Sequence, residues 1–571
     1  MININQIIEQ KLKVILKDLG YDEEPQILIS SRPDLGEFQY NGVMGIAKTI
    51  KANPLFIAEK ICFELEKDNS FVNINIAGPG FINISLNSNY LIELINQSEE
   101  QLNLNKTIFL DYGGANVAKS LHVGHLRSAN IGEALKRLAI RLGYKTISDA
   151  HLGDWGRPMG LIILEIKNRY PHLSYFEEDN ETDDLDLTNQ DLEEIYPYAS
   201  NRAKEDDDYL NAAKEITMQL QNGHSGYLRL WNKIINVSKT SIKKIYDELN
   251  TTFDLFEGES DSQKYIELLM EHLKSKDLVK ESDGALIIEL EESDDNAPMP
   301  PLLLKKTDGA ILYATTELAT IYSRIKNYQP DEIWYIVDNR QSLHFKQVFR
   351  AVSKSQMAPQ TKLEFLGFGT MNNEEGKPFK TRDGNVMTLE SLLNLVTVET
   401  EKRLNQEIKD NRQSIARSLA IATIKYADLL PNRSTDYVFD PQKFSELEGK
   451  TAPYLLYSVI RIKSLIKKGL DQNMQIKLIT NLEQETAKAV ALTLIKKGLV
   501  LEQAFKEKSL NEITNYLYEL ASIYNRFYQE CPILIERDES LKTSWFSLSN
   551  KVLETMTELL NILAIDIPEK M

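Results

Sequence analysis

The chain has 571 residues, of which 42% are hydrophobic, and its two cysteines, Cys62 and Cys531, lie far apart. At about 150 residues per domain this length predicts two to four domains with buried cores, and two isolated cysteines exclude a disulfide framework and a thiolate zinc site. The net charge of −18 argues against a general nucleic-acid coat protein, although an acidic enzyme can still present one basic face to RNA.

The first residues, MININQIIEQKLKVIL, alternate apolar with polar or charged side chains at helical spacing. This pattern is unlike a signal sequence, and no long uncharged apolar run occurs in the chain. We therefore expect a soluble cytoplasmic protein that uses no membrane, and the low cysteine content fits a reducing compartment.

Residues 1–105 predict a separate N-terminal α+β module. A helical start is followed by a second stretch of helical period at 42–65. Two runs, 72–77 and 81–86, then alternate apolar with polar residues around a Gly-Pro-Gly turn. Because alternation gives each run one buried face and the turn reverses the chain, the two runs predict a β-hairpin.

From residue 106 the pattern changes to strand, loop and helix. Residues 107–112 (TIFLDY) predict a strand, and a helical period follows from residue 124 until Gly143, which is a stop signal. Leucine and isoleucine side chains share one face of this helix, which leaves Lys136, Arg137 and Arg141 largely off it.

Later apolar runs at 331–338 and 362–369, separated by a helix from Gln341, indicate a parallel sheet covered by helices. We therefore expect an α/β, Rossmann-like domain over 106–390, without the glycine fingerprint of dinucleotide enzymes. An insertion occupies about 165–250, and its run 177–194, with ten acidic residues in eighteen, predicts a solvated segment. From 391 to 571 successive amphipathic stretches predict an all-α helical bundle.

The stretch NVAKSLHVGHLRS, residues 116–128, places His122 and His125 at the start of a helix that follows a strand. A zinc pair normally needs a third ligand and the glutamate of H-E-x-x-H, whereas Val123 and Gly124 fill this gap. Structural histidines are a second interpretation. The third is a phosphate grip, in which Gly124 lets a nucleotide approach the helix N-terminus and two imidazoles donate to phosphoryl oxygens.

This stretch resembles the HIGH signature of class I aminoacyl-tRNA synthetases, and the longer string N-V-A-K-x-x-H-V-G-H-L-R-S is similar to the arginyl-tRNA synthetase version. The resemblance continues along nearly the whole chain, in GEFQYNGVMGIAK, INIAGPGFINISL, HLGDWGRPMG, FEGES, DGAILYATTELA, VDNRQSLHFKQVF, GKPFKTRDGN and the closing IDIPEKM. It implies that 106–390 is a class I catalytic domain, that 1–105 binds the tRNA elbow, and that 391–571 binds the anticodon.

The resemblance also implies which residues contact ATP. His122 and His125 would face the ATP phosphates together with Gly124. The segment GKPFKTRDG resembles the KMSKS loop but departs strongly from it, and its Lys377 and Lys380 would act from the other side. In this family the lysine before HIGH compensates for such a loop, which implies a catalytic role for Lys119.

The arginine pocket implied by the resemblance needs carboxylates matched to a planar guanidinium, an aromatic wall and polar groups for the α-amino and α-carboxylate ends. Glu259 and Glu317 would supply the charges, Tyr313 the wall, and Asn116 and Gln341 the contacts to the amino-acid ends. The family usually has aspartate at 317, and the extra methylene of Glu317 moves the carboxylate by roughly 1.5 Å. In HLGDWG, the residues His151, Asp154 and Trp155 would line the same site or pack a strand-to-helix corner.

For RNA, the resemblance implies two surfaces. Phe38, Gln39 and Asn41 are candidate contacts to the tRNA elbow. Tyr454, Tyr457 and Arg461 combine aromatic and basic groups, which can stack bases and hold phosphates in the anticodon.

The function implied is that of an arginine–tRNA ligase, which activates L-arginine with ATP and transfers it to the 3′ end of tRNA(Arg). Magnesium would accompany ATP, coordinated mostly by phosphates and water, and no metal would be bound by the protein alone. We expect the chain to act as a monomer. Two alternatives are another HIGH-type nucleotidyltransferase and a non-catalytic RNA-binding paralogue.

Overall fold

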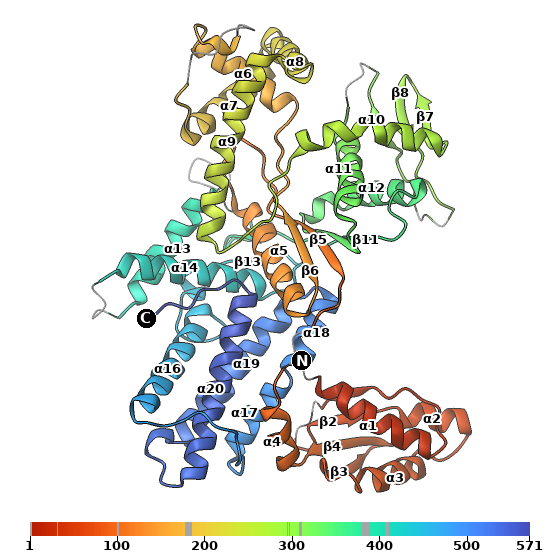
Figure 1. The fold of residues 1–571 in the computed structure, drawn as a ribbon, viewed down its shortest axis with the longest axis vertical. Helices are drawn as coiled ribbons and strands as arrows, with labels where there is room; N and C mark the ends of the chain where they lie inside the picture. Colours follow the sequence, from red (N-terminus) through yellow and green to blue (C-terminus); the bar gives the residue numbers. More distant parts are fainter. Residues whose placement is uncertain are drawn as a thin grey trace. The chain divides into compact units, whose positions relative to one another are not determined.

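The structure is a computed structural model that describes residues 3–30, 32, 34–99, 102–176, 185–293, 295, 297–307, 311–377, 379, 387–405 and 410–571. The chain divides into two compact units. One comprises residues 1–102, 446–561 and 567–571, and the other comprises residues 103–445 and 562–566. Their helices and strands are labelled in Figure 1. Among the described residues, no helix combines the length and apolar character needed to span a membrane.

The N-terminal module of the first unit is an antiparallel sheet with helices packed on it. The sheet has the order β1-β2-β4-β3. Its strands are β1 (Ile27–Ile29), β2 (Phe38–Tyr40), β3 (Phe71–Ala77) and β4 (Phe81–Leu86), and its helices are α1 (Ile4–Asp18), α2 (Val43–Ile50), α3 (Pro54–Leu65) and α4 (Ser88–Asn96). The predicted hairpin is confirmed, because β3 and β4 pair antiparallel, with an irregularity between Val72 and Asn75.

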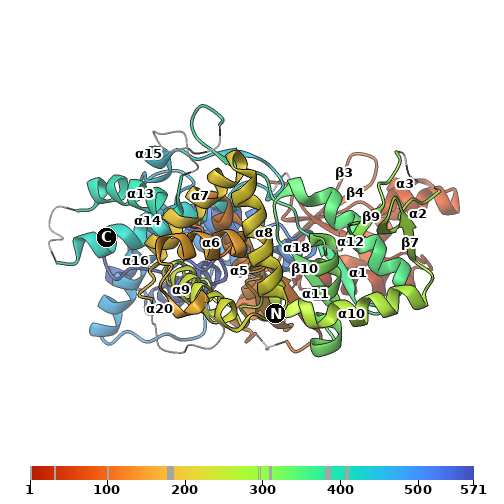
Figure 2. The same ribbon diagram turned by 90° about the horizontal axis from the view of Figure 1, so that it is seen from above.

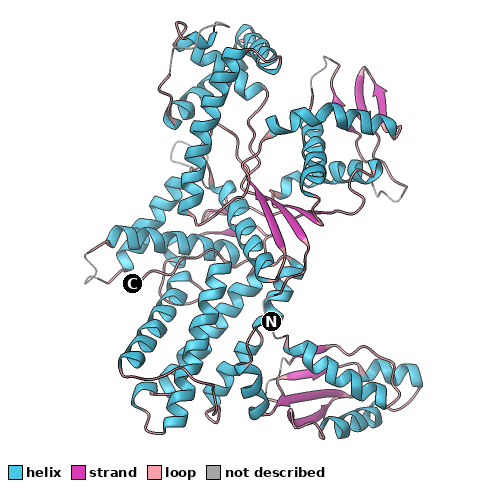
Figure 3. Ribbon diagram, viewed as in Figure 1, coloured by secondary structure: helices cyan, strands magenta, loops and turns pink. Residues whose placement is uncertain are grey.

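The rest of this unit is helical, as predicted (Figure 3). Its elements are α16 (Ala452–Asp471), α17 (Glu485–Ile495), α18 (Lys497–Glu507), α19 (Asn511–Glu530), η3 (Ile533–Ile535) and α20 (Glu539–Ile562). Buried leucine, isoleucine and aromatic side chains on α16, α19 and α20 form its core.

The second unit is built on a four-stranded parallel sheet with the order β11-β10-β5-β6. Its strands are β5 (Thr107–Asp111), β6 (Lys145–Asp149), β10 (Glu332–Tyr335) and β11 (Lys362–Phe365). Because all four strands run the same way, their carboxyl ends share one edge, where Asp111 pairs in register with Asp149 and Tyr335. The predicted Rossmann-like sheet is therefore confirmed.

Helices and short strands surround this sheet. The helices are α5 (Val123–Arg141), α10 (Glu259–Ser275), α11 (Tyr313–Tyr328), η2 (Asn339–Gln341), α12 (Ser342–Ser355), α13 (Leu389–Arg403), α14 (Arg412–Leu429) and α15 (Pro441–Phe444). A small antiparallel sheet contains β7 (Val279–Ser282), β8 (Ala285–Ile288) and β9 (Leu302–Lys305), and the two-residue strands β12 (Met371–Asn372) and β13 (Tyr437–Val438) pair with each other.

The insertion forms its own group of helices, which both ribbon views show together (Figure 2). They are α6 (Arg157–Arg169), η1 (Ser174–Phe176), α7 (Asn189–Glu205), α8 (Asp207–Gln221) and α9 (Ser225–Glu248). Within the predicted solvated run, residues 177–184 lie outside the described residues, and the end of the run forms the start of α7, capped by Thr188.

The compact unit that contains the parallel sheet continues past residue 390 to Ser445, because α13 and α14 pack on each other and on α5. Residues after 391 also include one short strand, β13.

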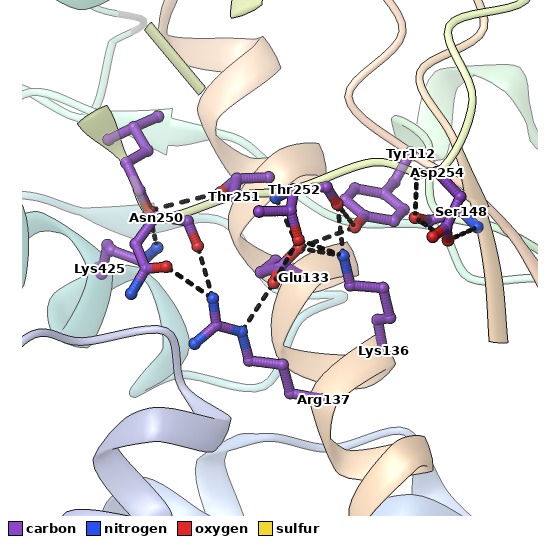
Figure 4. A network of polar contacts seen from close by, with 11 residues as sticks. Tyr112, Glu133, Lys136, Arg137, Ser148, Asn250, Thr251, Thr252, Asp254 and Lys425 are labelled. Carbon is purple, nitrogen blue, oxygen red and sulfur yellow. Dashed lines mark hydrogen bonds and ion pairs between the residues drawn. The ribbon is translucent and has the colours of Figure 1, made fainter. Parts of the chain in front are cut away.

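Helix α5 is buried on nearly all sides, although the sequence pattern showed only one apolar face. Lys136 is only 6% exposed, and its ammonium pairs with Glu133 at 2.7 Å (Figure 4). Glu133 also accepts from Arg137 at 2.7 Å and from the hydroxyl of Tyr112 at 2.9 Å. On the opposite side, Arg127 pairs with Asp428 of α14 at 2.8 Å, and both side chains are essentially inaccessible. Arg127, Glu133 and Lys136 of this helix are therefore part of the core.

Candidate active site

A cavity of about 680 Å³ lies at the carboxyl edge of the parallel sheet. It is lined by eight of the residues singled out from the sequence: Asn116, His122, Gly124, His125, Glu259, Tyr313, Glu317 and Gln341. These residues come from five segments spread over more than 200 positions, so the fold brings together what the resemblance implied.

The tip of α5 is capped by its own histidines. His122 is the N-cap, and its Nδ1 accepts from the backbone N–H of Gly124 at 3.0 Å. The Nδ1 of His125 accepts from the backbone N–H of His122, also at 3.0 Å, and the two ring centroids are 3.9 Å apart. Since each Nδ1 accepts a hydrogen bond, each neutral ring carries its proton on Nε2. Both histidines are thus prepared to donate from Nε2.

The pKa values keep these rings neutral. Burial, together with the neighbouring His122 and Lys119, lowers the pKa of His125 to about 3. Burial also lowers the pKa of His122, with contributions from Lys119 and Arg340. At neutral pH the pair therefore offers two N–H donors without a net charge of its own.

The histidine turn is tied to the segment that follows the KMSKS-like loop. His122 forms an isolated antiparallel bridge with Thr388, and the N–H of Leu389 donates to the carbonyl of Leu121 at 2.8 Å. The first residue of α13 is consequently fixed to the turn that precedes α5.

Three loops cross closely at one side of the cavity. Asn116 bridges Gly153, and Leu152 bridges Gly258, each in parallel. A Cβ atom at Gly153 would lie 2.2 Å from Oδ1 of Asn116, and one at Gly258 would lie 2.5 Å from Cγ of Asp154. Only glycine permits this approach, which places Asn116 and Glu259 on the same wall.

Glu317 is buried and Glu259 is half-buried, and both carboxyl groups have raised pKa values. Burial raises the pKa of Glu259 to about 7, and the nearby Asp154 and Glu317 act in the same direction. Burial likewise raises the pKa of Glu317, which accepts a hydrogen bond from the hydroxyl of Tyr313. Clustered carboxylates with raised pKa values match a site for a positively charged ligand.

A second polar layer under these carboxylates was missed by sequence reasoning. The guanidinium of Arg324 bonds Asp111 at 2.7 Å and Asp149 at 2.9 Å, and Arg324 is fully buried. Asp149 also bonds Nδ1 of His151 at 3.2 Å. Burial lowers the pKa of His151, but this bond and the charges of Asp149 and Asp111 together raise it to about 9. The signal in the sequence was Asp111 at the end of the predicted strand 107–112, whereas the strand that ends at Asp149 was not predicted.

Other residues near the cavity fall into two groups. His151, Arg340 and His344 also line it, and the ring of His344 lies 4.9 Å from that of Tyr313. Asp154 is buried and accepts from the N–H of Ser260 at 2.9 Å, and Trp155 lines a smaller neighbouring cavity of about 290 Å³.

Of the predicted lysines, Lys119 and Lys377 are described, and neither lines this cavity. Lys119 instead lines a separate cavity of about 750 Å³, and its Nζ lies 4.8 Å from the centre of the Tyr196 ring. Lys377 is exposed and pairs with Glu375 at 3.0 Å. Lys380 lies outside the described residues.

The candidate RNA contacts differ in exposure. Phe38 is fully buried in the N-terminal module, so its assignment as a surface contact is corrected to a core position. Gln39 donates to Asn83 at 2.8 Å, and Asn41 is half-buried. Tyr457 is 51% exposed.

The other two bundle candidates are half-buried. Tyr454 accepts from Asn525 at 2.8 Å, and the guanidinium of Arg461 stacks over Tyr528 at 4.5 Å.

Comparisons with known proteins cover the chain in three parts. Residues 3–86 match the model of the arginyl tRNA synthetase N terminal domain, residues 88–441 match that of the tRNA synthetases class I (R) catalytic domain, and residues 455–571 match that of the DALR anticodon binding domain. The arginine–tRNA ligase of Alkaliphilus oremlandii is 42% identical over 584 residues, which cover 100% of this chain and 98% of that protein.

Two further relatives agree. The arginine–tRNA ligase of Agathobacter rectalis is 41% identical, covering 100% of this chain and 99% of that protein. The crystal structure of the arginyl-tRNA synthetase of Plasmodium falciparum superposes with a TM-score of 0.83 at 24% identity over the full length of both chains, which supports the shared fold. These similarities do not favour the alternatives of a non-catalytic paralogue or another nucleotidyltransferase. The chain belongs to the arginyl-tRNA synthetases of class I, the family of arginine–tRNA ligases.

Proposed function

We propose that the 680 Å³ cavity holds ATP and L-arginine side by side and that the residues lining it catalyse arginyl-adenylate formation. The observation that carries this assignment is the combination, in one cavity, of a helix tip with two Nε2 donors and a wall of carboxylates. The first suits phosphates, and the second suits a guanidinium.

In the activation step, an oxygen of the arginine carboxylate attacks the α-phosphorus of ATP, the new C–O–P linkage forms, and the bond to pyrophosphate breaks. Negative charge then grows on the departing pyrophosphate. The Nε2–H groups of His122 and His125 donate to oxygens that gain this charge, and their fixed caps mean that they need no reorganisation during the reaction. Gly124 leaves space for the triphosphate beside the helix N-terminus.

In the proposed arginine site, the guanidinium takes its countercharge from Glu259 and Glu317, and Tyr313 lies against it. The hydroxyl of Tyr313 donates a hydrogen bond to Glu317. This bond holds the Glu317 side chain, which is longer than aspartate by one methylene, in one orientation. Asn116 and Gln341 bind the α-amino and α-carboxylate groups, which directs the carboxylate toward the α-phosphorus.

Lys119, Lys377 and Lys380 complete the proposed phosphate site. Lys119 lies close enough to His122 and His125 to lower their pKa values, so a change of its side-chain rotamers would bring its charge to the phosphates. Magnesium enters with ATP, coordinated by phosphates and water.

For transfer, we propose that tRNA(Arg) is bound at its elbow through Gln39 and Asn41 and at its anticodon through Tyr454, Tyr457 and Arg461. The exposed ring of Tyr457 supports base stacking there, with Arg461 nearby at 6.0 Å from that ring. We further propose that the chain acts as a monomer in the cytoplasm.

The decisive test is ATP–pyrophosphate exchange with each of the twenty amino acids, with and without tRNA. We expect exchange with arginine, and the family implies that it requires tRNA. Exchange with another amino acid would contradict the arginine pocket, and tRNA binding without any exchange would favour the non-catalytic paralogue.

A further inference from the structure

The insertion holds the loop before α5 at two successive residues. Ala118 has a φ of +61°, in the left-handed region that a residue with a Cβ adopts rarely, and its backbone N–H donates to Oγ of Ser238 at 3.2 Å. Ser238 is a buried residue of α9. The unusual conformation of Ala118 is therefore supported by α9, and it sets the direction in which Lys119 leaves the loop.

The side chain of Lys119 is then met by Tyr196 of α7. Its Nζ lies 4.8 Å from the ring centre, within the range of a cation–π contact. Tyr196 is half-buried and packs against the hydrophobic core of the insertion, so its ring is held in place. The residue lies on α7, which is distant in sequence from the loop.

This contact keeps the ammonium away from the nucleotide. Lys119 lines the 750 Å³ cavity with Ser241 and Lys244 of α9 and Thr388 beside α13, whereas the histidines line the 680 Å³ cavity. The charge of Lys119 nevertheless lowers the pKa values of both His122 and His125. Lys119 is therefore close to the phosphate site and turned away from it.

We propose that Tyr196 is a positioning residue for amino-acid activation, because its ring competes with the ATP phosphates for the ammonium of Lys119. This inference rests on the proposed role of Lys119 in activation. In the nucleotide-free enzyme the ammonium is held on Tyr196, and ATP binding must move it. The insertion thereby lowers the apparent affinity for ATP, because only the molecules in which Lys119 has left the ring can use its ammonium to bind the phosphates.

The test compares Tyr196→Leu, Tyr196→Phe and the control Tyr198→Leu in tRNA-supported exchange with arginine. Tyr198 lies on the same helix, is 48% exposed and contacts Arg169 instead of Lys119. Loss of an exposed cation–π contact should lower the KM for ATP about two- to fivefold in Tyr196→Leu. Tyr196→Phe keeps the ring face and should match the wild type, as should Tyr198→Leu.

The same substitution made in the Lys119→Ala variant separates an effect on the position of Lys119 from a general effect on folding. In Lys119→Ala the Tyr196→Leu change should leave the KM for ATP unaltered, because the competing ammonium is gone. A higher KM for ATP in Tyr196→Leu, an unchanged KM, or an effect that persists in Lys119→Ala would overturn the inference.

The outcomes also distinguish a failure of the proposed function from a failure of the roles of Lys119 and Tyr196. Absence of arginine-dependent exchange in the wild type would contradict the proposed function itself. Normal wild-type exchange with an unchanged Lys119→Ala rate would contradict only the role of Lys119 and, with it, that of Tyr196.

Discussion

Nδ1 of His125 accepts a hydrogen bond from the backbone N–H of His122 at 3.0 Å, so the backbone of one histidine fixes the ring tautomer of the other. His125→Asn should keep this cap, because an asparagine Oδ1 stands near the position of Nδ1, but it removes the Nε2 donor. We expect arginine activation to fall about 10²- to 10³-fold, as for loss of one donor to a developing charge, with tRNA affinity retained.

His125→Ala removes cap and donor together. Its activation should fall at least as far, and its melting temperature should also drop. Exchange kinetics, tRNA binding and thermal unfolding measured on both variants check this. Equal losses of activation and of tRNA binding would contradict a phosphate role.

The pKa of Glu259, raised to about 7 by burial and by neighbouring carboxylates, predicts a pH-dependent arginine affinity. Below pH 7 the carboxyl is protonated and no longer attracts the guanidinium, and above pH 7 it is charged. The KM for arginine should therefore rise about tenfold for each unit of pH below 7 and level off above 8. Glu259→Gln should show a high KM that is flat between pH 6 and 8, and a parallel pH dependence in that variant would assign the titration elsewhere.

Glu317→Asp introduces the residue that the family usually has at this position. In this chain the shorter side chain would withdraw the carboxylate from the hydroxyl of Tyr313 and from the guanidinium. We expect the KM for arginine to rise about tenfold, the effect of losing one hydrogen bond to a charged group, with the KM for ATP unchanged. An improved KM would mean that the pocket adjusts around aspartate.

Tyr457→Ala should weaken tRNA binding while leaving arginine affinity intact, since its ring is half exposed on α16. Loss of one base stack predicts a decrease of about tenfold or more in tRNA affinity. Phe38→Ala is the contrasting variant, because removal of this fully buried ring should reduce stability by about 3–5 kcal/mol. Weaker arginine binding with normal tRNA affinity in Tyr457→Ala would contradict the RNA assignment.

Glu133→Gln should be strongly destabilising, because the buried carboxylate compensates both Lys136 and Arg137 (Figure 4). Breaking a buried charge cluster by removing one partner predicts a loss of about 3–5 kcal/mol in the free energy of unfolding. Asp247→Asn, which breaks the exposed Lys243–Asp247 pair, is the control and should cost less than about 1 kcal/mol in thermal or urea unfolding. Similar melting curves for the two variants would contradict the structural role of the cluster.

The elements of this protein were predictable from local sequence because their signals are local. Alternation at 81–86 and the turn at Gly78 predicted the hairpin, and the apolar runs at 107–112, 331–338 and 362–369 predicted strands of one parallel sheet. Helical period ending at Gly143 predicted α5. Shared strand direction then required that the segments after these strands meet at one edge, so most of the cavity wall followed from the motifs.

The tertiary structure alone decided which charged side chains are buried and where each one points. Lys136 lies off the apolar face of α5 in the helical pattern, yet Glu133 and the loop at Thr252 cover it. Arg324 is compensated by aspartates from two strands more than 170 positions away, and Lys119 is turned toward Tyr196 by a backbone conformation at Ala118. Periodicity records only the average polarity of a face, whereas the burial of a charge depends on partners that the fold brings from distant parts of the chain.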